Sequence, residues 1–159
     1  MMNILAVDPG KKGGAVLMDA SGIIHSMLTS GDNEEEMRMF ILAALSFCVQ
    51  WNASVKAVIE FCQPFPGIAA KANFQVGVGY GFWRGLFVAN HIGYESVRAQ
   101  VWQTIITKKK GWSRVELKKE LVAEAVRRWP DIGKLKKGEQ SGVADAALLA
   151  EFTRTRGMT

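Results

Sequence analysis

Short apolar runs bounded by turn sequences predict strands in the first part of the chain. Pro9-Gly10 and Ala20-Ser21-Gly22 separate three such runs, so these runs predict three antiparallel strands joined by tight turns. Two further runs predict a fourth and a fifth strand. The five predicted strands span residues 3–8, 13–19, 23–28, 55–60 and 94–97.

In the rest of the chain, apolar residues at helical spacing predict helices. Asn33 is placed to cap a helix whose first turn is acidic, and the glycine-rich segment 73–90 predicts a second helix. Ser113-Arg114-Val115-Glu116 has the form of a capping box and opens a third helix, which Pro130 ends. Ser141 is placed to cap a last, almost wholly apolar helix.

This order of elements predicts an α/β fold, with a five-stranded mixed sheet and helices on both faces. A right-handed crossover through the first helix would place strand 55–60 parallel to strand 3–8. The 159 residues favour one domain over 1–159, and 48% apolar with 22% charged residues exclude disordered, collagen-like and coiled-coil chains.

The ends of the chain and its cysteines restrict the class of protein further. No apolar run reaches the roughly 18 residues of a membrane span, and the N-terminus lacks the basic start of a signal peptide. A cytoplasmic protein is therefore expected. Cys48 and Cys62 fit no metal-binding spacing and are expected to be free core thiols.

Positive charge is concentrated in the last third of the chain. Residues 101–159 carry 13 Lys and Arg against 7 Asp and Glu, whereas residues 1–100 carry 7 against 8. This asymmetry favours a polyanionic partner such as nucleic acid. A solvated surface is the alternative.

Three acidic residues stand at positions where a carboxylate is unfavourable without a partner. Asp8 and Glu60 each end a buried strand, and Asp145 interrupts an apolar helix. Singly, they are explained by a turn, a lysine partner and the helix dipole. If the first and fourth strands are adjacent and the last helix covers their ends, the three side chains converge and repel one another. Two Mg²⁺ or Mn²⁺ ions about 3.5–4 Å apart would relieve this repulsion and suit attack of water on a phosphodiester.

The acidic segments LAVDPG, AVIEFC and GVADAALLAEF resemble those of the RuvC-type Holliday junction resolvases of the RNase H-like superfamily. The resemblance covers nearly the whole chain and is nearest to the phage and bacterial branch, which implies the cytoplasm of a bacterium or of a phage-infected host cell. It implies a homodimer that binds four-way DNA junctions and nicks two strands symmetrically with Mg²⁺ or Mn²⁺. It also implies that Asp8, Glu60 and Asp145 are catalytic metal ligands.

One departure from the resolvase pattern concerns the last helix. The family usually carries a second acid, or a histidine, three or four residues before the position of Asp145, where this chain has Gly142 and Ser141. Glu139 is the nearest upstream carboxylate and becomes an additional candidate ligand. A weaker second metal site, a site completed by water and substrate phosphate, and a junction-binding module with little or no cleavage all remain open.

Basic and aromatic residues supply candidate DNA contacts. Three consecutive lysines followed by glycine and tryptophan suit phosphate contact combined with base stacking, and in the resembled family the loop after Glu60 reaches toward the junction centre. Solvated charges and core-covering aromatics are the alternatives. The candidates are Lys11, Lys12, Phe65, Lys71, Phe74, Lys108, Lys109, Lys110, Trp112, Arg114 and Lys118.

Gly77, Gly81 and Gly85 recur at every fourth position of the second predicted helix. Glycine costs about 1 kcal/mol per position in a helix interior, so this spacing suggests close approach of another element. The approach is either internal, against the sheet, or across a two-fold axis, and the resolvase resemblance favours the second. The predicted dimer interface includes Gly77, Gly81, Phe82 and Gly85, with apolar area from Trp83, Leu86 and Phe87.

Two other activities of the same superfamily fit part of the pattern. Asp8-Pro9-Gly10 followed by two lysines and two glycines is similar to the first phosphate loop of actin-like and sugar-kinase-like ATPases. Those proteins are longer and close a second domain over ATP, so no nucleotide cofactor is expected. A branched-DNA or flap nuclease remains open, because the catalytic core does not dictate the DNA shape that is bound.

Overall fold

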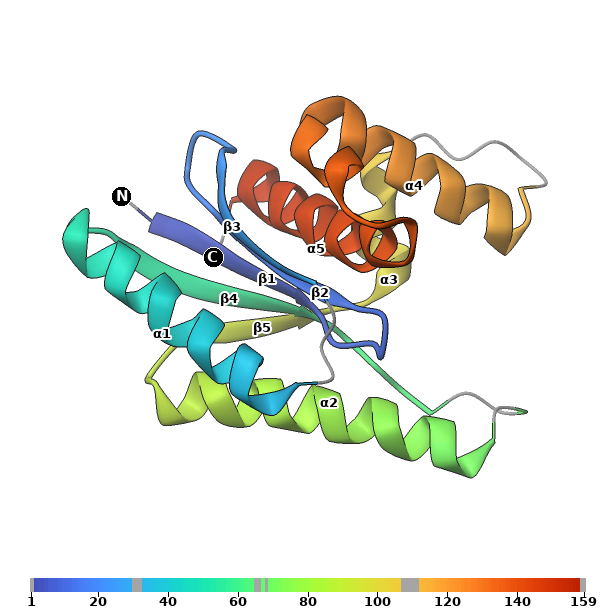
Figure 1. The fold of residues 1–159 in the computed structure, drawn as a ribbon, viewed down its shortest axis with the longest axis horizontal. Coiled ribbons are helices and arrows are strands. Elements are labelled where there is room, and N and C mark those ends of the chain that lie inside the picture. The colour runs from blue at the N-terminus through green and yellow to red at the C-terminus, as the bar shows by residue number, and fades with distance from the viewer. Residues whose placement is uncertain (1, 30–32, 65–66, 68, 107–111, 158–159) are drawn as a thin grey trace.

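The computed structural model describes residues 2–29, 33–64, 67, 69–106 and 112–157 (Figure 1). The elements are β1 Met2–Asp8, β2 Gly14–Met18, β3 Ile24–Thr29, α1 Glu34–Gln50, β4 Ser54–Glu60, α2 Ala70–Ala89, β5 Tyr94–Val97, α3 Ala99–Trp102, η1 Gln103–Ile105, α4 Arg114–Arg128, η2 Pro130–Lys134 and α5 Lys137–Arg156.

The five strands form one mixed sheet in the order β3-β2-β1-β4-β5. The three N-terminal strands pair antiparallel, and β4 pairs parallel to both β1 and β5. The predicted α/β fold and the predicted parallel pairing of the first and fourth strands are therefore confirmed. Parallel pairing places the carboxyl ends of β1, β4 and β5 at one edge of the sheet.

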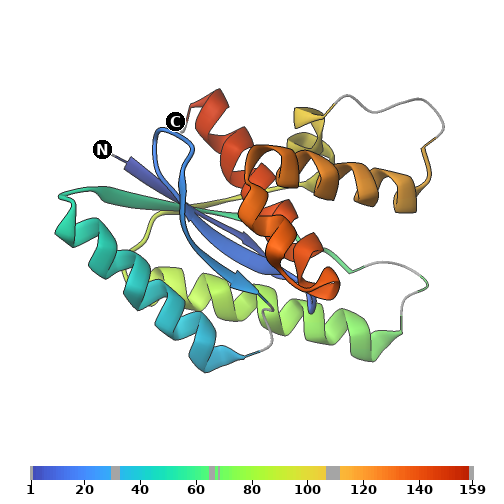
Figure 2. The ribbon, with the colours of Figure 1, turned by 45° about the horizontal axis from the view of Figure 1, so that its top comes forward.

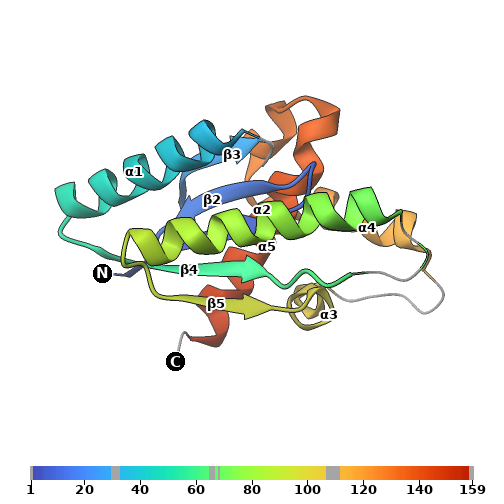
Figure 3. The same ribbon diagram turned by 90° about the horizontal axis from the view of Figure 1, so that it is seen from below.

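Helices cover both faces of the sheet, as predicted. α4 and α5 lie on one face, and α1 and α2 lie on the other (Figures 1 and 3). Along β1 the side chains alternate, so that Ile4 and Ala6 face α5 whereas Leu5 and Val7 face α1 and α2. Burial on both faces explains why residues 4–7 of β1 form an unbroken apolar run rather than an alternating one.

Two helix starts agree with the capping signals in the sequence. The Asn33 side chain accepts hydrogen bonds from the Glu35 and Glu36 amides, at 3.0 and 3.2 Å. At α4 the Ser113 amide donates to Glu116 at 2.7 Å, and the Glu116 amide donates to the Ser113 hydroxyl at 3.2 Å. The capping box is therefore formed in full.

Other helix boundaries differ from the prediction. α2 begins at Ala70 rather than at residue 73, and its cap, Ala69, makes no side-chain hydrogen bond. α5 begins at Lys137, so Ser141 lies inside the helix and does not cap it. Gln140 instead ties the first turn of α5 to the preceding segment by donating to the Gly133 and Leu135 carbonyls. Neither of these starts carries the Ser, Thr, Asp or Asn cap that makes a helix start visible in a sequence.

The remaining differences from the prediction concern short helical segments. The sequence pattern did not predict α3, η1 or η2, which are three to five residues long. α2 and α5 contain 20 residues each. Among the described residues, no helix combines the length and the apolar content needed to cross a bilayer.

Candidate active site

Asp8 and Glu60 end two neighbouring strands at the carboxyl edge of the sheet. Val7 pairs with Ile59 in the parallel β1–β4 ladder, so the two acids that follow stand side by side. Because side chains alternate along a strand, both acids point to the α5 face of the sheet, like Ala6 and Val58 before them. The predicted proximity of Asp8 and Glu60 therefore follows from the observed register.

α5 brings Asp145 to the same edge through a direct backbone contact. Gly142 forms an isolated parallel bridge with Gly13, in the loop between β1 and β2. A Cβ atom on Gly142 would overlap the carbonyl of Lys12, and one on Gly14 would lie 2.8 Å from the Val143 nitrogen. Glycines on both sides of this contact let the helix backbone rest on the loop that begins at Asp8. Figure 2 shows α5 lying on this side of the sheet.

The three carboxyl groups share one electrostatic environment. Burial raises the pKa of Glu60 to about 8, and the charges of Asp8 and Asp145 act in the same direction. Burial also raises the pKa of Asp145 to about 6, with Lys118 opposing and Asp8 adding to this shift. Burial raises the pKa of Asp8 as well, against the hydrogen bond from the Gly10 amide. All three groups resist ionisation because they are buried close to like charges.

Hydrogen bonds fix two of these carboxylates from outside the acidic group. The indole N–H of Trp102, which is fully buried, donates to Glu60 Oε2 at 2.7 Å. The Gly10 amide donates to Asp8 Oδ1 at 3.0 Å. Sequence reasoning did not assign Trp102 to the site. The sequence carried no signal for this role, because it does not show that the indole N–H is buried and therefore needs an acceptor.

Lys118 lies inside the acidic group. Its ammonium pairs with Asp145 Oδ2, and its side chain is 45% exposed whereas that of Asp145 is 7% exposed. Lys118 was predicted as a DNA contact on the basic surface, and its position relative to Asp145 was not foreseen. The other oxygen of Asp145, Oδ1, is buried and has no hydrogen-bond partner among the described residues.

This oxygen-rich group has the chemistry of a divalent-cation site, although its side chains do not form a closed coordination shell. Within the described ranges, no three His, Cys, Asp or Glu side chains are placed to enclose a metal ion. Mutual repulsion among the three carboxylates and the unpartnered Asp145 Oδ1 nevertheless favour added positive charge, of which the Lys118 ammonium supplies one. Carboxylate oxygens are the ligands that Mg²⁺ and Mn²⁺ prefer.

Glu139 and the position of the missing acid are placed by the geometry of α5. Glu139 precedes Asp145 by six residues, which puts it about 120° around the helix and about 9 Å along its axis from Asp145. Burial, Lys118 and Asp8 act on the pKa of Asp145, and Glu139 is not among these causes. Gly142, one turn before Asp145, has no room for a side chain. We therefore leave Glu139 out of the proposed ligand set.

The predicted DNA contacts fall into separate groups. Lys11 and Lys12 are exposed in the loop after Asp8, and Arg114 is exposed in the first turn of α4, one turn before Lys118. Lys71 is exposed in the first turn of α2. Phe65, Lys108, Lys109 and Lys110 lie outside the described residues.

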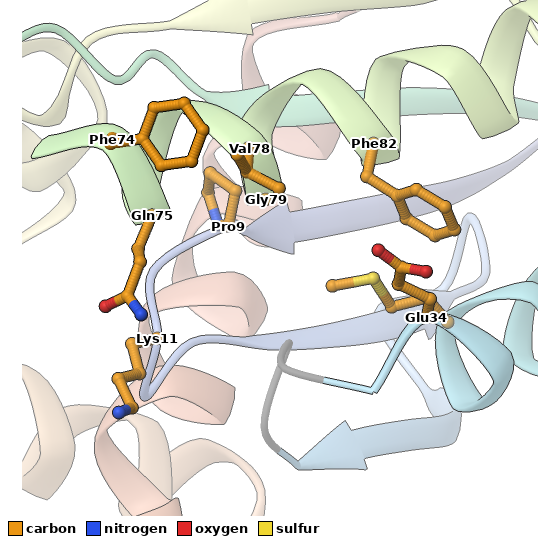
Figure 4. A pocket seen from close by; sticks show the side chains of 9 residues that line it. Pro9, Lys11, Glu34, Phe74, Gln75, Val78, Gly79 and Phe82 are labelled. Carbon is orange, nitrogen blue, oxygen red and sulfur yellow. The ribbon is translucent and has the colours of Figure 1, made fainter. Parts of the chain in front are cut away.

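A pocket of about 370 Å³ lies on the α1–α2 side of the sheet, next to the loop after Asp8 (Figure 4). Phe74 and Gln75 from α2 and Lys11 from the loop line it, with Phe82 at its other end. Asp8, Glu60 and Asp145 do not line this pocket, since they point to the α5 side of the sheet. Lys11 and Phe74, both predicted DNA contacts, therefore lie together but apart from the acids.

Trp112 faces away from the acidic group. It lines a second pocket, of about 430 Å³, with Ile105, Glu120 and Arg127 among others. Glu120 and Arg127 follow Lys118 by two and nine residues, which places them about 160–180° from Lys118 around α4. The tryptophan therefore lies against the side of α4 opposite to the side that meets Asp145.

The raised pKa values of this site predict how the stability of the metal-free protein depends on pH. We expect its melting temperature to fall by several degrees between pH 5 and pH 8. The folded chain holds protons on Asp145 up to about pH 6 and on Glu60 up to about pH 8, whereas the unfolded groups release them near 3.8 and 4.5. In this window the folded state binds more protons, so the free energy of unfolding decreases as pH rises.

The control for this prediction is Glu60→Gln, which should flatten the decline of the melting temperature. Asp19 and Glu124, whose pKa values are lowered to about 2, give stability that is fully present above their unfolded values and constant in this window. A melting temperature that is constant or rises from pH 5 to pH 8 would contradict the shared acidic site.

Solved structures of Holliday junction resolvases share the fold of this chain. Thermus thermophilus RuvC in complex with a Holliday junction substrate superimposes with a TM-score of 0.56 and 12% identity, over 99% of this chain and 97% of that one. Another Thermus thermophilus RuvC structure gives 0.57 and 12%, over 98% and 97%. The yeast mitochondrial Holliday junction resolvase Ydc2 gives 0.53 and 19%, over 95% and 77%.

At the level of sequence, no protein-family model and no curated protein matches this chain. The structural likeness extends over almost the whole chain and includes the mixed five-stranded sheet with its helices on both faces. The chain thus has the fold of the RuvC-type Holliday junction resolvases, within the RNase H-like architecture.

Proposed function

We propose that this protein is a metal-dependent endonuclease that resolves four-way DNA junctions by paired nicking. The observation that carries the proposal is the convergence of Asp8, Glu60 and Asp145, from three separate elements, in one buried group whose pKa values are all raised. A buried group of this kind at an edge of the sheet is typical of a catalytic site rather than of a structural one. The fold shared with the junction resolvases supports DNA as the substrate.

Asp8, Glu60 and Asp145 would hold the divalent ions, Mg²⁺ or Mn²⁺, two per subunit. When bound, such ions supply the positive charge that activates water and stabilises the charge developing on the scissile phosphate. The chain itself sets the positions of the carboxylates. The Trp102 indole and the Gly10 amide orient Glu60 and Asp8, and the Gly13–Gly142 contact holds Asp145 over them.

Basic residues around the acids would bind phosphates of the DNA backbone. Lys11 and Lys12 lie beside the end of β1. Lys118 lies on α4 at Asp145, and Arg114 lies one turn before it. Phosphate contacts of this kind position a duplex without reading its sequence. The other predicted contacts would bind the DNA nearer to the junction centre. They are Lys71, Phe74 and the predicted contacts outside the described residues.

Paired nicking needs two sites, and α2 offers a face for a second copy of this chain. A Cβ on Gly77, Gly81 or Gly85 would meet nothing within 4 Å, so these glycines serve no internal contact. Gly79, which lies 3.0 Å from the Pro9 carbonyl by the same measure, is the glycine that packs internally. Exposed Val78 and Val88 flank the open glycines on this face.

Of the four side chains expected to supply apolar area to the dimer interface, two are buried inside the protomer and two are half-buried. Trp83 and Phe87 are fully buried beneath the sheet, so their predicted place in the interface is wrong. Helical geometry explains this, because they lie on the side of α2 opposite to Gly85. Phe82 and Leu86 are half-buried, and Phe82 lines the pocket of Figure 4.

The proposed dimer can be tested by substituting Gly81. Gly81→Glu should convert a dimer into a monomer in sedimentation equilibrium, since it places a charge in the middle of the proposed interface. The free chain accepts the side chain, because nothing lies within 4 Å. Gly138→Glu on α5, where the space is also open, is the matched control and should remain dimeric. A wild-type monomer, or a Gly81→Glu dimer, would contradict the interface.

A junction-binding module with little or no cleavage is the second candidate. Gly142 favours it, since no acid fits at that position of α5. Cleavage of labelled four-way, Y-shaped and duplex DNA, with and without Mn²⁺, separates the candidates. Metal-dependent nicking of the four-way junction at symmetric positions supports the nuclease. Binding without nicking in Mg²⁺ and Mn²⁺ supports the module, and equal cleavage of Y-shaped DNA indicates a broader branched-DNA nuclease.

A further inference from the structure

Arg98 stacks on an aromatic ring one residue beyond the acidic site. Its guanidinium carbon lies 5.7 Å from the centroid of the Phe61 ring. Phe61 follows Glu60 directly, and its amide donates to the Val97 carbonyl at 2.8 Å. The parallel β4–β5 ladder therefore holds Arg98 at the same edge of the sheet as Glu60.

Other side chains keep the Phe61 ring in place. The ring of Tyr80, from α2, meets it edge-on, at 6.2 Å between centroids and an angle of 87°. The Tyr80 hydroxyl hydrogen-bonds to the Ser96 hydroxyl at 2.8 Å, which ties this ring to β5. Arg98 thus rests on a surface that is fixed from two elements.

The guanidinium of Arg98 has no anionic partner among the described residues, and its side chain is exposed. Several other arginines are neutralised, for example Arg38 by Glu35 and Arg127 by Glu124. Arg156 also stacks on a ring, that of Phe152 at 5.1 Å, but it pairs with Glu95. A stacked guanidinium with free N–H donors is pre-organised to bind a phosphate in a two-point manner.

We propose that Arg98, held against Phe61, binds a backbone phosphate of the DNA where it passes from the acidic site to the α2 side of this edge. This inference rests on the proposed function, since it takes DNA as the ligand. Along the carboxyl edge the order is the loop with Lys12, then Asp8, Glu60 and Arg98. Because side chains alternate along the strands, Phe61 and the stacked Arg98 lie on the α2 side of this edge, whereas the acids face α5. Arg98 would therefore hold the DNA where it continues past the edge, and not at the scissile phosphate.

The test is the affinity of Arg98→Gln for a labelled four-way junction, measured by fluorescence anisotropy without divalent metal at several salt concentrations. We expect binding about tenfold weaker than wild type. The slope of log affinity against log salt concentration should become less steep by about 0.9, as for one lost phosphate contact. Arg98→Lys should keep the wild-type slope, because it keeps the charge. Phe61→Leu should weaken binding by about threefold with the slope unchanged.

Arg156→Gln is the matched control, since it removes a stacked arginine that is already paired, and it should keep both affinity and slope. Melting temperatures of the variants show that each is folded. Wild-type affinity and slope in Arg98→Gln, with the junction bound normally by wild type, would overturn this inference alone. A wild-type chain that binds no junction would overturn both this inference and the proposed function.

Discussion

Replacing Asp8 by asparagine should abolish nicking of a four-way junction and leave junction binding intact. Asparagine keeps the acceptor for the Gly10 amide and the volume of the side chain, but removes the charge that a divalent ion would need. Loss of a ligand of this kind removes several kcal/mol of transition-state stabilisation, so the cleavage rate should fall by at least about 100-fold. Cleavage is measured on labelled junctions in Mn²⁺, and binding by gel shift in EDTA.

The same substitution should stabilise the metal-free protein. At pH 8 the carboxylates repel one another, and Asp8→Asn removes one source of this repulsion. Its melting temperature without metal should therefore lie above that of wild type, whereas a purely structural aspartate would give a decrease. Asp131→Asn, at an exposed position in η2, is the control and should change neither cleavage nor stability. Wild-type cleavage by Asp8→Asn would contradict the metal-site proposal.

Strand ends are the part of the site that the sequence pattern could predict. An apolar run defines a buried strand, and the position at which it stops defines where a polar side chain emerges. Because β1 and β4 are parallel neighbours, Asp8 and Glu60 follow paired residues at the same edge. The argument needed only the order of elements and the handedness of the crossover, both of which are strongly constrained.

Contacts between distant side chains could not be predicted in the same way. Trp102 reaches Glu60 across 42 positions of sequence, and Lys118 reaches Asp145 across 27. Both depend on how α3 and α4 are placed above the sheet, which the spacing of apolar residues does not determine. Lys118 stood in a basic segment, so its charge suggested a DNA phosphate rather than a carboxylate of the same chain.

The glycine before Asp145 shows a further limit of sequence reasoning. At the level of sequence, Gly142 is only a position where an acid is missing from the resolvase pattern. The structure gives the reason for its size, since the backbone of α5 meets the Lys12–Gly13 segment there. The property that matters is the absence of a Cβ atom, because any side chain at this position would lift α5 away from the loop. The position of Asp145 over the strand ends depends on that contact.

Substituting Gly142 should therefore destabilise the protein strongly. Gly142→Ala should destabilise the protein by about 3–5 kcal/mol, because its Cβ would overlap backbone atoms of Lys12 and Gly13 that have no free side to move into. The melting temperature should fall by roughly 10 °C, measured by thermal unfolding without metal. Gly142→Asp, which would restore an acid at this position, should be at least as unstable.

Gly138→Ala, one turn earlier on α5, is the matched control. Nothing lies within 4 Å of its added Cβ, so the usual helix preference for alanine should leave the protein as stable as wild type or slightly more stable. Ser141→Asp tests the same missing acid at the neighbouring half-buried position and should fold. Wild-type stability of Gly142→Ala would mean that α5 can retreat from the loop. In that case the backbone contact would not be what holds Asp145 above Asp8 and Glu60.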